Sequence, residues 1–247
     1  VNIPGGHTLY TVSSFLEAIN GLLSAMTVRI KGEVSSVDKR DRVVYFSLKD
    51  SQDESVLNCL VFRYHYDISG VALEVGQEVI VEGVPEIYKP SGRFSLKVQS
   101  IELSGAGALK KAYDELKLKL EQEGLLALER KRTLPEFPER IALITSSQGA
   151  AIGDFMMNVG RYGFKIRLYN ASVEGKRAVF DLIKALKFFN QHPDQYDVLV
   201  LIRGGGSLES LQAFNNEALV REVAASKIPV LAGIGHEKDV SLAALAA

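Results

Sequence analysis

The sequence predicts a multidomain protein with both α and β structure, in which an N-terminal β-barrel precedes an α/β domain with a parallel sheet. In the first part of the chain, apolar residues alternate with polar ones, which is typical of half-buried strands. In the last part, short apolar runs alternate with helical periodicity, which is typical of parallel strands connected by helices. A charged helical stretch separates the two patterns. We therefore expect a barrel domain at 1–103, a helical linker at 104–134 and an α/β domain at 135–247.

The composition is that of an ordinary globular chain. With 247 residues and 47% apolar content, the chain can bury two modest cores. A single cysteine, Cys59, excludes disulfides within the chain and a cysteine-rich zinc site, so a reducing, cytoplasmic setting is expected. No apolar run approaches the ~20 residues of a membrane span, and no signal-peptide pattern opens the sequence, so we expect no membrane partner. Because the net charge is −1, nucleic acid would have to be bound by local patches and base stacking.

The first predicted element is an amphipathic helix over residues 10–26. Ser14 and Glu17 fit a capping box, and apolar residues recur at steps of three and four. We expect this helix to cap a hydrophobic core.

Five period-two strands follow between Thr27 and Leu103, with a short predicted helix at 65–73. This strand count is that of an oligonucleotide-binding (OB) barrel, whose exposed face commonly stacks bases on aromatic side chains. Most aromatic residues in strands belong to the core, however, and alternation alone does not tell which face is exposed. The candidates for a binding face are aromatic and basic residues: Tyr45, Phe62, Tyr64, Tyr88, Phe94, Arg29, Lys31, Arg42, Arg63, Lys89 and Arg93.

The predicted linker, GALKKAYDELKLKLEQEGLLALERKR, is a helix of mixed charge. Gly124 is expected to break it, and Pro135 and Pro138 are expected to end it. Mixed charge runs of this kind usually form a solvated helix face.

The α/β domain contains four predicted strands: RIALIT, FKIRLYNASV, DVLVLI and IPVLAGI. Helical periodicity follows the first three strands, including a helix over 207–226. Right-handed crossovers then give a parallel sheet that is covered on both faces. Because parallel strands place their carboxyl ends at one edge, the turns that follow them should lie together there, where ligands of open α/β sheets bind.

The turn LIRGGGS predicts an anion-binding site at this edge. Glycines allow backbone N–H groups to approach an anion, and a helix that opens at Ser207 would add its positive dipole end. Arg203 adds a fixed charge, and the expected phosphate-binding positions of this turn are Gly204, Gly205, Gly206 and Ser207. The turn is neither the dinucleotide motif GxGxxG nor a P-loop, and the alternative reading is that its glycines only permit tight packing.

Two other turns carry polar residues to the same edge. Ser146 and Ser147 follow the first strand and could donate to a phosphate, and Asp154 lies early in the helix after them. The sequence GIGHEKD follows the fourth strand and carries His236 and Asp239. His236 would act as general base or acid on a phosphodiester, and either Asp154 or Asp239 would orient it. Arg203 and the glycine turn would neutralise the charge of the transition state.

A metal site is poorly supported by the sequence. The carboxylates and His236 have none of the spacings HxH, HExxH or DxD. The expected chemistry therefore requires no cofactor, with Mg²⁺ kept as the alternative.

Three long motifs resemble the large subunit of bacterial exodeoxyribonuclease VII. They are KLKLEQEGLLALERKRTLPEFPERIALITSSQGAAIGDF, LIRGGGSLESLQAFNNEALV and IPVLAGIGHEKD, in the order found in that family. The preceding sequences YTVSSFLEAINGLL, VRIKGEVSS and VYFSLKD are similar to the family's N-terminal OB domain. The resemblance covers nearly the whole chain. At Gly153, the family often has a basic residue instead.

The resemblance implies a nuclease that degrades single-stranded DNA from both ends to short oligonucleotides, in many members without a divalent metal. It implies catalytic roles for Asp154, Arg203, His236 and Asp239. Family members continue beyond the sequence LAALAA into long helices that bind several copies of a small subunit. We therefore expect this chain to be truncated before that helical region.

Two alternatives to a nuclease subunit remain from the sequence. The chain could bind single-stranded nucleic acid without catalysis until its C-terminal region and the small subunits are present. It could instead be a small-molecule phosphohydrolase in which the barrel is only structural.

Overall fold

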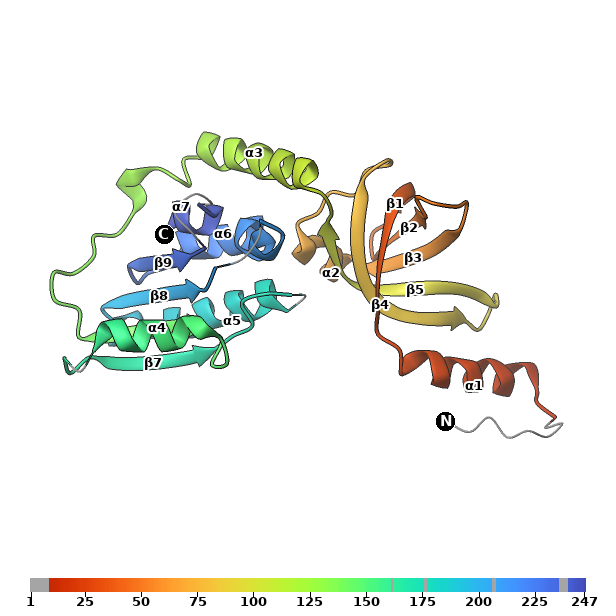
Figure 1. Ribbon diagram of the computed structural model, residues 1–247, viewed down its shortest axis with the longest axis horizontal. Helices are drawn as coiled ribbons and strands as arrows, with labels where there is room; N and C mark the ends of the chain where they lie inside the picture. The colour runs from red at the N-terminus through yellow and green to blue at the C-terminus, as the bar shows by residue number, and fades with distance from the viewer. Residues whose placement is uncertain (1–8, 161, 176, 206–207, 236–239) are drawn as a thin grey trace. The chain divides into compact units, whose positions relative to one another are not determined.

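The computed structural model describes residues 9–160, 162–175, 177–205, 208–235 and 240–247. The chain divides after Gly105 into two compact units. Figure 1 shows a barrel in the first unit and a sheet with helices in the second. The predicted fold class, an OB-type barrel followed by an α/β domain with a parallel sheet, is confirmed.

The first unit is a closed barrel with the strand order β1-β2-β3-β5-β4. Its strands are β1 (Val28–Lys39), β2 (Val43–Lys49), β3 (Val56–Phe62), β4 (Glu78–Tyr88) and β5 (Arg93–Leu103). The inward positions of β2 and β4 are buried, among them Val44, Phe46 and Val81, and they alternate with partly buried or exposed positions. The period-two pattern of the sequence is therefore the inside-outside alternation of a small barrel.

Barrel closure depends on two local features. β3 pairs with β5 in parallel through Cys59, Leu60 and Val61, whereas the other pairs are antiparallel. A bulge interrupts the β4–β5 register at Gly83, where an added Cβ would lie 2.4 Å from the carbonyl oxygen of Lys97. Only glycine fits such a close approach of two backbones.

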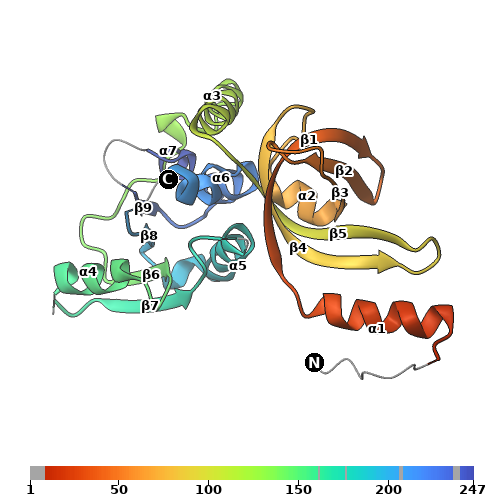
Figure 2. The same cartoon turned by 45° about the vertical axis from the view of Figure 1, so that its right-hand side comes forward.

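Two helices accompany the barrel. α2 (Arg63–Ser69) packs against β2, β3 and β5, and Figure 2 shows it beside these strands. Tyr66 is buried and its hydroxyl accepts a hydrogen bond from the backbone N–H of Leu73 at 3.1 Å. This contact fixes the chain between β3 and β4.

α1 (Val12–Ser24) differs from the prediction in its cap and in its burial. Its capping box is formed by Thr11 and Ser14, because Thr11 has extended backbone geometry and its hydroxyl accepts from the Ser14 N–H. The helix has no buried residue, so the expectation that it caps a core is wrong. The amide of Asn20 instead pairs with the backbone of Ile87, at 2.9 and 2.8 Å, and holds α1 on the outside of β4.

The second unit contains a four-stranded parallel sheet in the order β7-β6-β8-β9. Its strands are β6 (Arg140–Thr145), β7 (Lys165–Asn170), β8 (Val198–Arg203) and β9 (Val230–Ile234). Its α-helices are α3 (Ala106–Gln122), α4 (Ala150–Val159), α5 (Ala178–Asn190), α6 (Glu217–Ala224) and α7 (Leu242–Ala246). Three 3₁₀-helices also occur, η1 (Leu128–Arg130), η2 (Pro193–Gln195) and η3 (Leu208–Asn215).

The predicted helix over 207–226 is divided in the structure. η3 follows the glycine turn and ends at Asn215. α6 begins at Glu217, where the side chain of Asn216 accepts hydrogen bonds from the N–H groups of Ala218 and Leu219. Asn216 is a strong N-cap and therefore restarts the chain as an α-helix. The expectation that an α-helix opens at Ser207 is wrong in this respect, and Ser207 itself lies outside the described residues.

Each face of the sheet has its own core. Ala142, Ile144, Leu199 and Leu201 point to the larger core, which also contains buried residues of α3, η3, α5, α6 and α7. Ile141, Leu143, Val198 and Val200 point to the smaller core, where Ile152 and Phe155 of α4 pack. The apolar runs of the sequence are thus strands that are buried on both faces.

The stretch predicted as a linker, 104–134, is grouped mainly with the second unit. Leu120 of α3 is fully buried in the larger core. The Lys119 ammonium lies 2.8 Å from Glu217 of α6, and the Tyr113 hydroxyl donates to the carbonyl oxygen of Val240 at 2.9 Å. The turn after α3 contains Gly124 with φ +70°, in agreement with the expected break.

The two central strands, β6 and β8, send their connections to opposite faces of the sheet. β6 leads into α4 on the smaller core, and β8 leads into η3 and α6 on the larger core. This is a topological switch point, where open α/β sheets form a crevice beyond the carboxyl ends of the strands.

The amino end of the same sheet is held by a structural ion pair. The Asp197 carboxylate, just before β8, accepts from the Arg140 guanidinium and from the backbone N–H of Arg140 at 2.7 Å. These bonds lower the pKa of Asp197 to about 2, and the bond from the guanidinium has the largest effect. The pair fixes β6 beside β8.

Of the helices in the described ranges, none is long and apolar enough to span a membrane.

We predict that Leu120→Ala destabilises the second unit by about 2–5 kcal/mol, because it leaves a cavity in a packed core. The matched control is Leu118→Ala on the same helix, where the side chain is 56% exposed and the expected change is within about 0.5 kcal/mol. Urea unfolding followed by circular dichroism measures both. Equal, small effects would mean that α3 is a solvated linker.

Candidate active site and nucleic-acid interface

The carboxyl ends of the four strands meet at one edge of the sheet, as the sequence predicts. Thr145 of β6 is in register with Asn170 of β7, and Arg203 of β8 is in register with Ile234 of β9. The turns 146–149 and 204–205 therefore leave the sheet at its switch point, from neighbouring strands. We call this region the carboxyl edge.

Arg203 is the buried charge of the carboxyl edge. Only 5% of its side chain is exposed. Its Nη1 donates to the carbonyl oxygen of Gly204 at 3.0 Å, and its Nη2 donates to Oε2 of Glu174 at 3.3 Å. A guanidinium that is buried beside an open turn is suited to bind the oxygens of a phosphate.

The glycine turn after Arg203 is open. Gly204 and Gly205 are exposed, and a Cβ on Gly204 would meet no atom within 4 Å. The alternative reading, that the glycines only permit tight packing, is therefore not supported at Gly204. Gly206 and Ser207 lie outside the described residues.

The turn after β6 is fixed by a residue of β7. The side chain of Asn170 accepts from the backbone N–H of Ser147 at 2.9 Å. The Ser146 hydroxyl accepts from the N–H of Gln148, and Gly149 forms the N-cap of α4 without a side-chain hydrogen bond. Ser147 is exposed beside this cap, where its hydroxyl can reach an anion.

Of the other three predicted catalytic residues, the structure describes only Asp154. Asp154 is exposed on α4, in its second turn, so dipole complementation in a first turn does not explain it. No described contact joins its carboxylate to Arg203. His236 and Asp239 lie outside the described residues. Their catalytic roles stay predictions.

No group of three or more potential metal ligands occurs among the described residues. Since His236 and Asp239 are not among them, this finding leaves the expected metal independence untested.

Two residues of the carboxyl edge were missed by the sequence analysis, Asn170 and Glu174. Asn170 lies within the predicted strand FKIRLYNASV, which was expected to run to Val173, and Glu174 follows that strand directly. β7 ends at Asn170 instead, so that Glu174 lies in a turn rather than next to a strand end. Asparagine is common in turns, so Asn170 is the residue from which the earlier end of β7 could have been predicted.

On the barrel, the register gathers an aromatic and basic surface across three strands. Tyr45 of β2 pairs with Leu60 of β3, which pairs with Lys97 of β5. The Lys97 ammonium lies 5.2 Å from the ring centroid of Phe62. We call Tyr45, Leu60, Phe62 and Lys97 the barrel patch. Its lysine and leucine were not among the predicted residues, because the β3–β5 pairing is not visible in the sequence.

The five aromatic candidates of the barrel are all exposed in the structure. Their exposed fractions lie between 41% and 59%, for Tyr45, Phe62, Tyr64, Tyr88 and Phe94. Aromatic side chains outside the core supply the π faces that stack on bases.

Most of the predicted cations are held by carboxylates rather than gathered with the aromatics. Arg29 pairs with Glu102 at 2.8 Å, Lys31 with Glu78 at 3.0 Å, and Arg63 with Asp67 at 2.8 Å. Tyr88 and Arg93 lie opposite each other in the backbone register at the end of the β4–β5 hairpin. Of the eleven candidates for the binding face, Tyr45 and Phe62 lie in the barrel patch.

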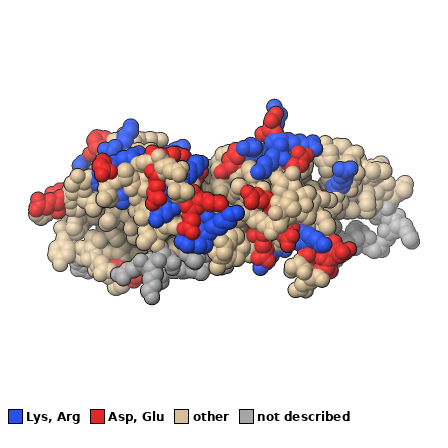
Figure 3. Space-filling view, turned by 90° about the horizontal axis from the view of Figure 1, so that it is seen from above, with Lys and Arg blue, Asp and Glu red and all other residues tan. Residues whose placement is uncertain are grey.

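The described surface has no broad field of one sign on the side shown in Figure 3, where basic and acidic side chains are interspersed on both units. This agrees with the net charge of −1. Binding of a polyanion would depend on local contacts.

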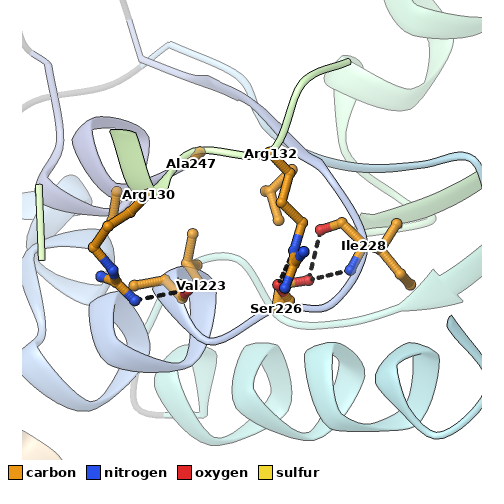
Figure 4. Close-up of a pocket in the computed structure, with 9 residues that line it drawn as sticks. Arg130, Arg132, Val223, Ser226, Ile228 and Ala247 are labelled. Carbon is orange, nitrogen blue, oxygen red and sulfur yellow. Dashed lines mark hydrogen bonds between the residues drawn. The ribbon is translucent and has the colours of Figure 1, made fainter. Parts of the chain in front are cut away.

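A separate hollow lies at the amino end of β9 and is shown in Figure 4. Arg132 donates to the carbonyl oxygen of Ser226 at 2.8 Å, and Arg130 donates to that of Ala224 at 3.4 Å. These arginines satisfy carbonyls at and beyond the end of α6, which is a structural role. The hollow is at the end of the sheet opposite the carboxyl edge.

Comparisons with known proteins support both units. Residues 10–102 match the family described as OB-fold nucleic acid binding domain, and residues 125–247 match the family described as exonuclease VII, large subunit. The exodeoxyribonuclease 7 large subunit of Thioalkalivibrio sulfidiphilus is 40% identical over 244 residues, which are 97% of this chain and 54% of that protein. The protein of the same name from Legionella pneumophila is 41% identical over 94% of this chain and 52% of its own length.

Among solved structures, the N-terminal domain of PriB from Thermoanaerobacter tencongensis is similar to the chain at 20% identity and a TM-score of 0.28. It covers 32% of this chain and 96% of that one. A score this low carries no argument, and the barrel assignment depends on the strand order and the family match.

The fold and the carboxyl edge define a class of protein in which an OB-fold domain is joined to an α/β domain with a buried arginine at its switch point. Residues 125–247 match the exonuclease VII large-subunit family, which confirms the resemblance seen in the motifs. The chain spans about half the length of the curated relatives it matches.

We predict that Phe62→Ala and Tyr45→Ala each weaken the binding of an oligothymidylate by about 5- to 100-fold, because each removes a surface on which a base stacks. Fluorescence anisotropy at fixed salt measures the dissociation constant. Phe137→Ala is the control, since Phe137 is 82% exposed and lies outside the barrel. Unchanged affinity in both barrel variants would exclude the barrel patch as the interface.

Proposed function

We propose that this chain is the DNA-binding and catalytic part of an exodeoxyribonuclease VII large subunit, which hydrolyses single-stranded DNA from both ends to short oligonucleotides. The observation that carries the proposal is the buried guanidinium of Arg203 at the switch point, beside the open turn that begins at Gly204. The names of the relatives support the family, and the reaction on DNA is our inference.

In this proposal, Arg203 and the amides of the glycine turn neutralise the negative charge that develops on the phosphoryl oxygens. Ser146, Ser147 and Gly204–Ser207 contact the phosphate. His236 accepts the proton of the attacking water, and Asp154 or Asp239 orients the imidazole and stabilises its charged form. The water oxygen bonds to phosphorus, the P–O bond to the leaving oxygen breaks, and the leaving oxygen takes a proton from the protonated His236 or from solvent.

The barrel would deliver the strand to this site. Single-stranded nucleic acid is bound by stacking platforms combined with cations. The barrel patch offers two aromatic rings and one cation, Lys97, whose ammonium also lies 4.0 Å from Glu86. Arg29, Lys31, Arg63, Tyr88 and Arg93 would contact the strand outside the patch, with the ion-paired cations exchanging carboxylates for phosphates.

We propose that catalysis needs no metal, with Mg²⁺ as the alternative, and that several copies of a small subunit complete the enzyme. A second candidate is favoured by the length of the chain, which is about half that of its relatives. In that case, this chain binds single-stranded DNA but does not cleave it alone.

The test is degradation of end-labelled single-stranded DNA in EDTA, with the native chain, with His236→Ala and with a full-length relative, each with and without its small subunit. We expect cleavage in EDTA by the full-length protein and its loss by at least 100-fold in the corresponding histidine variant. Cleavage only after Mg²⁺ is added would make Asp154 and Asp239 metal ligands.

The remaining outcomes separate the other functions. Salt-dependent binding without cleavage by the short chain would identify a binding fragment. Hydrolysis of nucleotides but not of oligonucleotides would identify a small-molecule phosphohydrolase and contradict the proposal.

A further inference from the structure

The contact between Glu174 and Arg203 joins the turn that follows β7 to the last residue of β8. The Arg203 side chain is 5% exposed, whereas that of Glu174 is 70% exposed. Their closest atoms, Nη2 and Oε2, are 3.3 Å apart. Charged hydrogen bonds are usually about 2.7–2.9 Å long, so this contact is loose for an ion pair.

The guanidinium does not depend on Glu174 for its position. Its Nη1 is bonded to the carbonyl oxygen of Gly204 at 3.0 Å, and its stem is buried at the end of β8. Glu174 instead accepts a hydrogen bond from the guanidinium and partly neutralises its charge. A buried charge without such a partner would destabilise the folded protein.

The turn presents Glu174 to Arg203 from a fixed base. The N–H of Ala171 donates to the carbonyl oxygen of Thr145 at 3.0 Å, and Val173 packs against the larger core. Gly175, with φ +74°, then turns the chain away. The carboxylate thus projects from an anchored segment toward solvent, and water can reach it freely.

A carboxylate and a phosphate present similar oxygen pairs to the arginine fork. We propose that the carboxylate of Glu174 occupies the phosphate position on Arg203 in the free protein and is displaced when a phosphate binds. This inference rests on the proposed function of Arg203. It makes Glu174 a competitor of the substrate, so that unbound sites keep a neutralised guanidinium.

Glu174→Gln should therefore tighten phosphate binding, because the amide keeps the length of the side chain but not its negative charge. We expect the affinity for inorganic phosphate and for a 5′-phosphorylated oligothymidylate to rise about 3- to 10-fold at low salt. The gain should shrink as salt is raised, since the carboxylate is exposed.

Calorimetry on the native chain, Glu174→Gln, Arg203→Lys and the double variant tests the proposal, with folding checked by circular dichroism. Glu139→Gln is the matched control, because Glu139 is exposed at the amino end of β6 and the charge change is the same. We expect tightening in Glu174→Gln alone, and most of it lost in the Arg203→Lys background.

Unchanged or weaker binding in Glu174→Gln, while Arg203→Lys still weakens binding, would overturn only the role of Glu174. Equal tightening in Glu139→Gln would overturn it as well, because bulk charge would then explain the effect. Native affinity in Arg203→Lys would overturn the phosphate site itself, and with it the proposed function.

Discussion

The pairing of β6 with β8 at the centre of a parallel sheet is the constraint on which the candidate site depends. Parallel pairing places the ends of both strands at one edge, and the connections of these two strands leave on opposite faces. The turns 146–149 and 204–205 therefore separate rather than cover each other. Arg203 is the last residue of β8, so the sheet both buries its stem and directs its head to this opening.

The two ends of the sheet use ion pairs in different ways. At the amino end, Asp197 receives several hydrogen bonds from Arg140, and its pKa falls to about 2. At the carboxyl edge, Arg203 has a single loose bond to an exposed carboxylate, Glu174. The first arrangement fixes two strands, and the second leaves a charge that another anion can bind.

Much of this fold follows from the sequence because periodicity and glycine turns are local signals. The five barrel strands, the four parallel strands and the position of Arg203 were all predicted from such signals. The division of the predicted helix at Asn216 was not, since a capping residue inside a helical pattern competes with that pattern.

Contacts between distant segments could not be predicted in the same way. Lys97 lies beside Phe62 only because β3 pairs with β5, 35 residues further along the chain. Glu174 reaches Arg203 only because β7 ends at Asn170, and Leu120 is buried only because α3 packs on the larger core of the sheet. In each case the contact depends on how distant segments pack together, and the type of residue alone does not predict it.

The most direct measurement is the change in backbone amide NMR shifts when inorganic phosphate and then a short phosphorylated oligothymidylate are added. If the carboxyl edge is the site, the phosphate-induced shifts gather at Thr145–Gly149, Asn170–Glu174 and Arg203–Gly205, and the oligonucleotide also shifts residues of the barrel patch. Shifts gathered at Arg130, Arg132 and Ser226, with the carboxyl edge unchanged, would contradict the account.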